Sequence, residues 1–252
     1  MVAAPRPKLD LSQLNTAVTS SFRAIKPLAV LLYGAPGSGK GTFGKILSQV
    51  THWPHISTGD LLRKHISADT EIGQASVALL EGNYAPDRIA NQVVSERILS
   101  VDCHNSFILD GYPRTLPQST TFLPLLRQME LEPVVVRLQL NHEAIKSRLQ
   151  ARVSCSHCGT SFNLISLRPK RPDQCDECGF ALITRTDDQV GLIEKRIKIY
   201  DSLTGPVERH LRESGLRHWE FDATLEPKQL LSEFLNNLIG SSLAVRSYLS
   251  AS

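Results

Sequence analysis

The fold of this chain is decided by one stretch, LAVLLYGAPGSGKGT, at residues 28–42. It begins with a short apolar run that ends at a glycine, which predicts a buried β-strand. The glycines that follow let backbone N–H groups turn inward around an anion, and a helix that starts near Gly39 adds its N-terminal dipole. Lys40 supplies a mobile positive charge for phosphate groups. The stretch therefore predicts a phosphate-binding loop rather than a glycine-rich turn with a chance lysine.

The loop departs from the pattern G-x-x-x-x-G-K-[ST] at its last position. Gly41 stands where a serine or threonine is usual, and Thr42 follows it. The hydroxyl that would touch Mg²⁺ is thus displaced by one residue, so we expect the ion to be held mainly through water. Asp110 ends a predicted strand, where a carboxylate can orient that water.

The rest of the chain alternates apolar runs with helical patterns. The strands are expected at 28–33, 54–57, 106–110, 133–140 and 217–222. The helices are expected at 39–50, from an N-cap at Thr58 through 59–66, and at 71–81, 86–99, 141–151, 188–212 and 227–239. This alternation predicts an α/β fold, a doubly wound parallel sheet of five strands with helices on both faces.

Composition excludes several classes of protein. The 252 residues suffice for one large domain or two small ones, and 41% apolar and 21% charged residues predict a packed core. The longest apolar runs are too short to span a bilayer, and a net charge of +3 does not call for nucleic acid. We therefore expect a protein that binds neither a membrane nor a nucleic acid. We also expect it to be a monomer.

The two ends of the chain are expected to lie outside the folded domain at 28–240. Residues 1–27 carry four basic residues against one acid, with several Ser and Thr. This segment is compatible with a mitochondrial targeting signal or with a frayed extension, so the compartment stays open between the cytoplasm and the mitochondrial matrix. Residues 241–252 are expected to form a tail.

Four of the five cysteines form two C-x-x-C pairs inside a turn-rich stretch at 153–186. Cys155 and Cys158 make the first pair, and Cys175 and Cys178 make the second. This spacing is typical of a tetrahedral Cys₄ zinc site, and two redox dithiols or disulfides are the less favoured alternative. Cys103 stands alone, and we expect it to be a small buried apolar residue.

Several motifs occur in order along the chain. They are GAPGSGKGT (34–42), STGDLLR (57–63), LDGYPRT (109–115) followed by Gln118, SRLQAR (147–152) and TRTDDQ (184–189). As a set they resemble the adenylate kinases, over about residues 28–240. The segment TEIG (70–73) is similar to the mitochondrial GTP–AMP phosphotransferase branch.

The resemblance implies an enzyme of adenine nucleotide homeostasis. Such an enzyme reversibly transfers a phosphoryl group from a nucleoside triphosphate, ATP or GTP, to AMP with Mg²⁺, giving two nucleoside diphosphates. The resemblance also implies an AMP-binding lobe at 57–86 and an inserted lid at 152–188. The cysteine pairs fall in that lid, so the predicted Zn²⁺ has a structural role.

The resemblance further implies three sets of site residues. AMP is expected to bind Thr58, Arg63, Tyr84, Ala85, Gly111, Arg114 and Gln118. The donor nucleotide is expected to bind Gly37, Ser38, Gly39, Lys40, Gly41, Thr42, Arg148, Arg152, Ser161 and Phe162. The moving phosphoryl group is expected to lie among Lys40, Arg114, Arg152, Arg185 and Arg196. Asn83 departs from the family, which often has a lysine there.

The residue types suit this chemistry, since a guanidinium binds phosphate oxygens bidentately and keeps its charge. Arg114 follows a predicted buried strand, at the edge where open α/β sheets bind ligands. Asp187 and Asp188 either pair with the lid arginines or cap the helix that follows.

The sequence is also compatible with two other functions. A P-loop kinase for another nucleoside monophosphate is disfavoured, because LDGYPRT with Gln118 resembles an adenine-reading site. A zinc-ribbon module that binds nucleic acid through Arg168, Lys170 and Arg171 is disfavoured, because no aromatic-rich basic face accompanies them.

Overall fold

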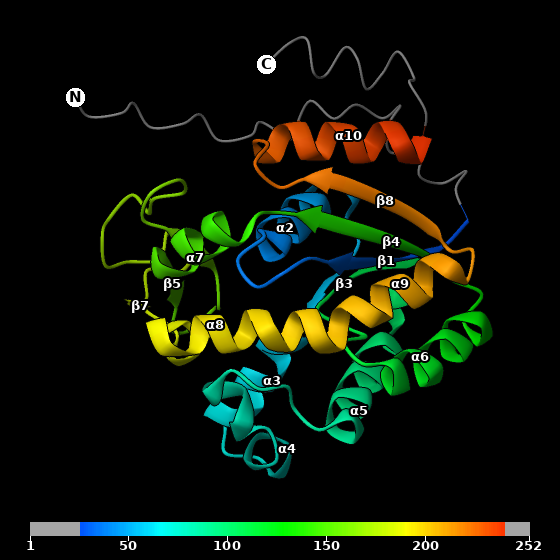
Figure 1. The fold of residues 1–252 in the computed structure, drawn as a ribbon, viewed down its shortest axis with the longest axis horizontal. Helices are drawn as coiled ribbons and strands as arrows, with labels where there is room; N and C mark the ends of the chain where they lie inside the picture. Colours follow the sequence, from blue (N-terminus) through cyan, green and yellow to red (C-terminus); the bar gives the residue numbers. More distant parts are fainter. Residues whose placement is uncertain (1–25, 240–252) are drawn as a thin grey trace.

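The computed structural model describes residues 26–239 (Figure 1). Its central sheet has five parallel strands in the order β2-β3-β1-β4-β8. The strands are β1 (Leu28–Tyr33), β2 (His55–Ser57), β3 (Ser106–Asp110), β4 (Glu132–Gln139) and β8 (Arg217–Asp222). The predicted five-stranded parallel sheet is thereby confirmed. The expectations for the tail, and for the N-terminal segment before residue 26, lie outside the described residues.

Helices cover both faces of this sheet because its central strand is apolar on both sides. Leu28, Val30 and Leu32 face one core, with α2 (Lys40–Thr51) and α10 (Pro227–Ile239). The alternate residues of β1 face the other core, with α5 (Asp87–Ile98), α6 (Leu116–Gln128) and α9 (Gly205–Glu213). Figure 1 shows α10 above the strands and α5, α6 and α9 below them. A fully buried parallel strand reads as a continuous apolar run, as the sequence of β1 does.

Some helices differ from the sequence prediction. The helix α6 was not predicted, since Pro117 and Pro124 interrupt its pattern; Pro117 is tolerated in the first turn, where no backbone N–H is needed. The helix predicted at 71–81 is instead the short α4 (Glu71–Gln74) followed by a 3₁₀ helix, Val77–Glu81. The N-cap of α3 (Thr58–Ser67) is Ser57 rather than Thr58, because the Ser57 hydroxyl accepts from Asp60 N.

The long helix predicted at 188–212 is interrupted in its middle. It consists of α8 (Val190–Ile199), a π turn at Tyr200–Thr204 and α9. The described part of the chain contains no helix that is both long and apolar enough to cross a bilayer.

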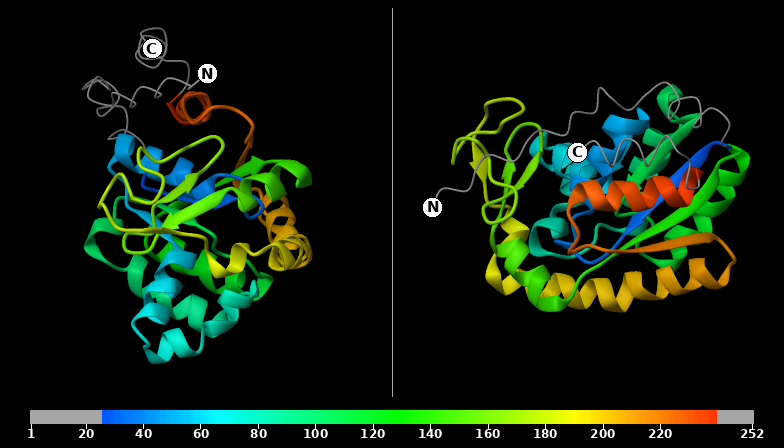
Figure 2. Two further views of the ribbon diagram at one scale, coloured as in Figure 1. Left: turned by 90° about the vertical axis from the view of Figure 1, so that its left-hand side faces the viewer. Right: turned by 90° about the horizontal axis from the view of Figure 1, so that it is seen from above.

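Two small lobes extend from the sheet. The first contains α3 and α4 and has its own apolar cluster around Leu62 and Leu79. The second, the lid, follows α7 (His142–Gln150) and contains a three-stranded antiparallel sheet of β5 (Arg152–Cys155), β6 (Ser161–Asn163) and β7 (Leu182–Ile183). Figure 2 shows the lid at one end of the molecule, and in Figure 1 the arrowheads of β4 and β8 point toward it. The carboxyl edge of the sheet, where ligands bind in such folds, therefore faces the lid.

Candidate active site

The phosphate loop joins β1 to α2 and turns on glycines with positive φ. Gly34, Gly37 and Gly39 have φ values of 141°, 82° and 97°. A Cβ at Gly37 would lie 2.9 Å from the side chain of Leu149 in α7, so the loop also packs too closely for any larger residue. The sequence requires glycine here for both conformation and space.

Lys40 is the first residue of α2, and its ammonium group lies within the loop. Its Nζ donates to the carbonyl oxygens of Gly34 at 2.6 Å and Ala35 at 3.0 Å. Burial lowers the pKa of Lys40 to about 8, while the carboxylate of Asp110 opposes that shift. The ammonium is thus held by carbonyl groups, which phosphate oxygens can replace.

Asp110 ends β3 beside the start of α2. A Cβ on Gly41 would lie 3.5 Å from Asp110 Oδ2, so the missing side chain leaves room next to the carboxylate. His55 Nε2 lies 3.9 Å from the same oxygen, and burial lowers the pKa of His55. A carboxylate with free space at a phosphate loop suits a water-held Mg²⁺ ion.

Asp188 gathers two arginines. Arg152 donates to both of its carboxylate oxygens, at 2.6 and 2.5 Å, and Arg196 donates to Oδ1 as well. Burial of Asp188 would raise its pKa, but the two guanidinium groups outweigh burial and lower the pKa. Arg196 also lies 3.3 Å from Asp187 Oδ2. Of the two roles predicted for these aspartates, pairing with the arginines is confirmed.

Arg185 connects the lid to α3. It donates to the hydroxyls of Ser154 at 2.8 Å and Ser161 at 3.0 Å. Its Nη2 lies 3.6 Å from Asp60 Oδ1, and Arg63 donates to the same oxygen at 2.6 Å. Burial works against the ionised form of Asp60, yet the two arginines lower its pKa to about 2. Sequence reasoning missed Asp60, because its partner Arg185 lies far away along the chain.

Two of the residues predicted to bind the donor nucleotide, Arg148 and Phe162, differ in where the structure places them. Arg148 lies beside the loop, 3.5 Å from Ser38 O, and also donates to Ala223 O at 2.8 Å. The ring of Phe162 is 7% exposed and packs with Cys155 and Cys175. Because the side chains of β6 alternate, the Phe162 ring is packed inside the lid rather than open to a nucleotide base.

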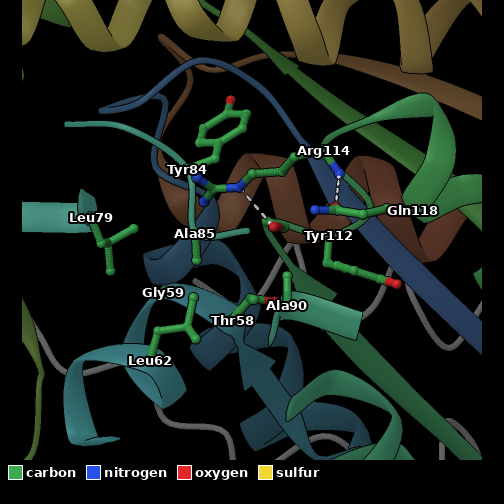
Figure 3. A pocket seen from close by; sticks show the side chains of 11 residues that line it. Thr58, Gly59, Leu62, Leu79, Tyr84, Ala85, Ala90, Tyr112, Arg114 and Gln118 are labelled. Atoms are coloured by element: carbon green, nitrogen blue, oxygen red, sulfur yellow. Dashed lines mark hydrogen bonds between the residues drawn. The ribbon is translucent and has the colours of Figure 1, made fainter. Parts of the chain in front are cut away.

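A pocket lies between α3, the segment before α5 and the loop after β3 (Figure 3). Its lining residues are Thr58, Gly59, Leu62, Leu79, Tyr84, Ala85, Ala90, Gly111, Tyr112, Arg114 and Gln118. Every residue predicted to bind AMP belongs to this lining except Arg63, which is paired with Asp60. The pocket thus combines apolar walls with an arginine and an amide.

The polar groups of the pocket are fixed by hydrogen bonds. Arg114 Nε donates to Gly111 O at 2.7 Å, and the Arg114 backbone N donates to Gln118 Oε1 at 2.7 Å. Gln118 Nε2 donates to Asp87 Oδ1 at 2.8 Å. Sequence reasoning missed Asp87, whose only signal is its place in the first turn of a helix, where acids are common.

The four lid cysteines gather around one point. Their sulfur atoms all lie within 4.8 Å of one another, and the described cysteines form no disulfide. Backbone N–H groups of His157 and Cys158 donate to Cys155 Sγ, each at 3.4 Å, and Glu177 N donates to Cys175 Sγ at the same distance. Four sulfurs with amide donors around them fit a tetrahedral Zn²⁺ ion.

These features define a class of protein. A parallel sheet carries a phosphate loop after its first strand. One arginine of the lid and one of α8 bind the same carboxylate, that of Asp188. A pocket lies beside the loop that follows β3. This is the construction of a P-loop enzyme that transfers phosphoryl groups between nucleotides.

Comparison with known proteins identifies the family. The family described as Adenylate kinase matches residues 32–216. The adenylate kinase of Thermosipho melanesiensis is 36% identical over 209 residues, which cover 82% of this chain and 97% of the relative. That of Pseudothermotoga lettingae is 41% identical over 182 residues, covering 71% and 84%. That of Methanosarcina acetivorans is 36% identical over 189 residues, covering 74% and 87%.

The chain therefore belongs to the adenylate kinase family, and its activity is phosphoryl transfer between ATP and AMP. The predicted family, fold and enzyme class are confirmed.

Proposed function

We propose that the moving phosphoryl group lies among Lys40, Arg114, Arg152, Arg185 and Arg196. One observation carries this assignment. Burial lowers the pKa of Lys40, and the positive charges of Arg114, Arg152 and Arg196 lower it further. Those arginines come from the loop after β3, the lid and α8, so distant parts of the chain converge on one ammonium. Burial and the charges of Arg63 and Arg152 likewise lower the pKa of Arg185. Like charges brought together disfavour one another unless an anion lies between them, and a polyphosphate supplies that anion.

The donor phosphates bind the loop at residues 37–42, with Arg148 beside it, and AMP binds the pocket of Figure 3. The chain aligns the two nucleotides in line, neutralises the developing charge and excludes water. Asp110 and the space at Gly41 would hold Mg²⁺ through water, and the ion supplies charge neutralisation on the phosphate oxygens. Zn²⁺ would hold the lid in shape, since the four cysteines leave no position open for a substrate.

ATP is the donor in the family's activity, and we propose that this chain prefers it to GTP. The segment at 70–73, which resembles the GTP-using branch, has a local structural explanation. The Thr70 hydroxyl accepts from Gly73 N at 3.1 Å and so caps α4. A Cβ on Gly73 would collide with His65 O. The motif is therefore explained by capping and packing, and it carries no argument about the donor base.

Initial rates with ATP, GTP and ITP as donors and AMP as acceptor test the donor assignment. ATP is expected to give the highest kcat/KM, and a higher value for GTP would overturn that assignment.

Arg114→Lys tests the phosphate cluster, because an ammonium cannot reproduce the planar fork of a guanidinium. We expect a severe loss of kcat, whereas near-parental turnover would remove Arg114 from the cluster.

We also propose that the enzyme acts as a monomer, because one chain supplies the loop, the arginines and the pocket. Light scattering at the concentrations used for the assay checks this, and a dimer there would contradict it.

A further inference from the structure

Tyr84 holds the side chain of Arg114 from one side. It follows the 3₁₀ helix Val77–Glu81 and leads into α5. The Cζ atom of Arg114 lies 4.8 Å from the centroid of the Tyr84 ring, which Figure 3 shows covering the arginine side chain. A guanidinium over an aromatic face is attracted by the ring quadrupole. The carbonyl of Gly111 holds the Nε edge, and within residues 26–239 the two terminal nitrogens donate no hydrogen bond.

The hydroxyl of Tyr84 takes part in a chain of hydrogen bonds whose direction can be assigned. Thr204 Oγ1 donates to Arg114 O at 3.2 Å, and a threonine hydroxyl has only one proton to donate. The Tyr84 hydroxyl, 2.8 Å from Thr204 Oγ1, must therefore be the donor of that pair. Tyr84 is thus linked to Arg114 in two ways. Its ring contacts the guanidinium, and its hydroxyl is connected to the Arg114 backbone through Thr204.

Thr204 is a fixed point for this chain. Its side chain is buried, and it is the last residue of the π turn Tyr200–Thr204. At the other end of the turn, the Tyr200 hydroxyl donates to Glu208, which pairs with Arg137 at 3.0 Å. The wide turn is therefore held at both ends. Single π turns inside α-helices are frequent at functional sites, and here the turn brings a hydroxyl to the backbone of Arg114.

We propose that Tyr84 is a positioning residue for Arg114. The Tyr84 ring fixes the plane of the guanidinium so that its terminal nitrogens face the acceptor phosphate, and the Tyr84 hydroxyl locks this arrangement to Thr204. The inference rests on the proposed role of Arg114 in the phosphate cluster. The family resemblance implies that Tyr84 contacts AMP directly. In this proposal Tyr84 instead affects binding of the AMP phosphate, through Arg114, and does not contact the nucleoside.

Binding of AMP and of adenosine to the full chain distinguishes these tasks. Tyr84→Leu removes ring and hydroxyl, and we expect about 2- to 30-fold weaker AMP binding with adenosine affinity unchanged. Tyr84→Phe keeps the ring but removes the hydroxyl, so it should weaken AMP binding by less than Tyr84→Leu does. An equal loss for adenosine would overturn the proposal, because Tyr84 would then contact the nucleoside itself.

A double-mutant cycle separates this proposal from the role of Arg114. In an Arg114→Ala background, Tyr84→Leu should have no further effect on AMP binding. The same loss in both backgrounds would overturn the proposal and leave the role of Arg114 intact. Unchanged turnover and AMP binding in Arg114→Ala alone would instead overturn the proposed function.

The matched control is Tyr112→Phe. Tyr112 also lines the pocket, but its ring packs edge-on against Phe122 and its hydroxyl donates to Asn91 Oδ1 at 2.8 Å. Its effect should be the same in both Arg114 backgrounds.

Should Tyr84→Leu fail to fold, Thr204→Val and Thr204→Ser replace it. Valine should weaken AMP binding selectively and serine should not, and equal AMP affinity in both would overturn the relay through Thr204.

Discussion

At Lys40 the fold holds a part-buried ammonium group close to other cations. Burial and the charges of Arg114, Arg152 and Arg196 all oppose its protonation, and Asp110 favours it. A charge held in this way interacts strongly with an incoming phosphate, because no water needs to be reorganised around it.

Lys40→Ala is expected to lower kcat by about 10²–10³, because a group that stabilises developing charge is lost. Melting curves of the variant and the parent check that both are folded. Equal turnover of the two folded proteins would contradict a role for Lys40.

The pH dependence of donor binding offers a second check on Lys40. Its pKa is about 8 in the free protein, and a bound polyphosphate stabilises the ammonium form and raises that pKa. ATP binding near pH 8 should therefore take up a fraction of a proton, and this uptake should fade as the pH falls toward 6. Calorimetry in buffers of different ionisation enthalpy measures the uptake. The same uptake in Lys40→Ala would assign the proton to another group.

The phosphate loop was predicted from its own residues, because it follows an apolar strand. Six of the eleven residues that line the pocket were predicted, from the resemblance to the adenylate kinases. Asp60, Asp87 and Thr204 were not predicted. Their contacts join segments that are far apart along the chain, as Arg185 with Asp60 and Thr204 with Arg114 show. A single sequence carries no signal for such pairs, since each residue alone is ordinary for its place in a helix.

At the scale of elements, the start of α8 depends on Asp188. Its carboxylate is fully buried and binds two arginines from different elements. Without it, Arg152 would lose its carboxylate partner, and Arg196 would keep only its pair with Asp187.

Asp188→Asn should lower the free energy of unfolding by about 3–5 kcal/mol and reduce kcat, because one partner of a buried ion pair is removed. Urea unfolding measures the first effect. Glu194→Gln is the control, since its pair with Lys146 is exposed and should contribute nothing measurable. Equal stability of the two variants would contradict the assignment.

The strands of the lid could not be predicted, although those of the central sheet could. The lid core contains only Cys155, Phe162 and Cys175 as buried apolar residues, so its sequence shows no apolar alternation. The four-cysteine cluster takes the place of a core, and metal binding then supplies the folding free energy. The strands β1, β3 and β4 could be predicted because they are buried on both faces and therefore read as continuous apolar runs.

Removing one zinc ligand, as in Cys175→Ser, should lower the melting temperature and release about one zinc per chain. Activity at low temperature should survive in part, because Lys40 and Arg114 lie outside the lid. Metal analysis measures the loss, with Cys103→Ala as a control outside the lid. Less than about a tenth of a zinc per parental chain, with reduced thiols, would refute the site.

At the scale of the whole molecule, the lid reaches over the sheet and touches both other parts. Lys45 in α2 donates to Thr160 of the lid at 2.8 Å, and Arg185 lies 3.6 Å from Asp60 in α3. These contacts join the lid to α2 and to α3, and we expect the lid to shield a bound triphosphate from water.

A bisubstrate mimic, two adenosines joined by five phosphates, should therefore protect the lid from proteolysis between residues 152 and 188. The mimic binds the loop and the pocket together and so favours the closed arrangement. Cleavage followed by mass spectrometry locates the cuts. A lid that is cut equally fast with and without the mimic would contradict closure.

In evolutionary terms, the π turn at Tyr200–Thr204 is a place where the chain can change its length by one residue. Removing one residue restores the hydrogen-bond pattern of an α-helix and keeps Val207 and Leu211 of α9 against the core. The same deletion inside α9 would rotate every later residue of the helix by about 100°. Deletion of Thr204 is therefore expected to keep the fold and to remove the hydroxyl that reaches Arg114.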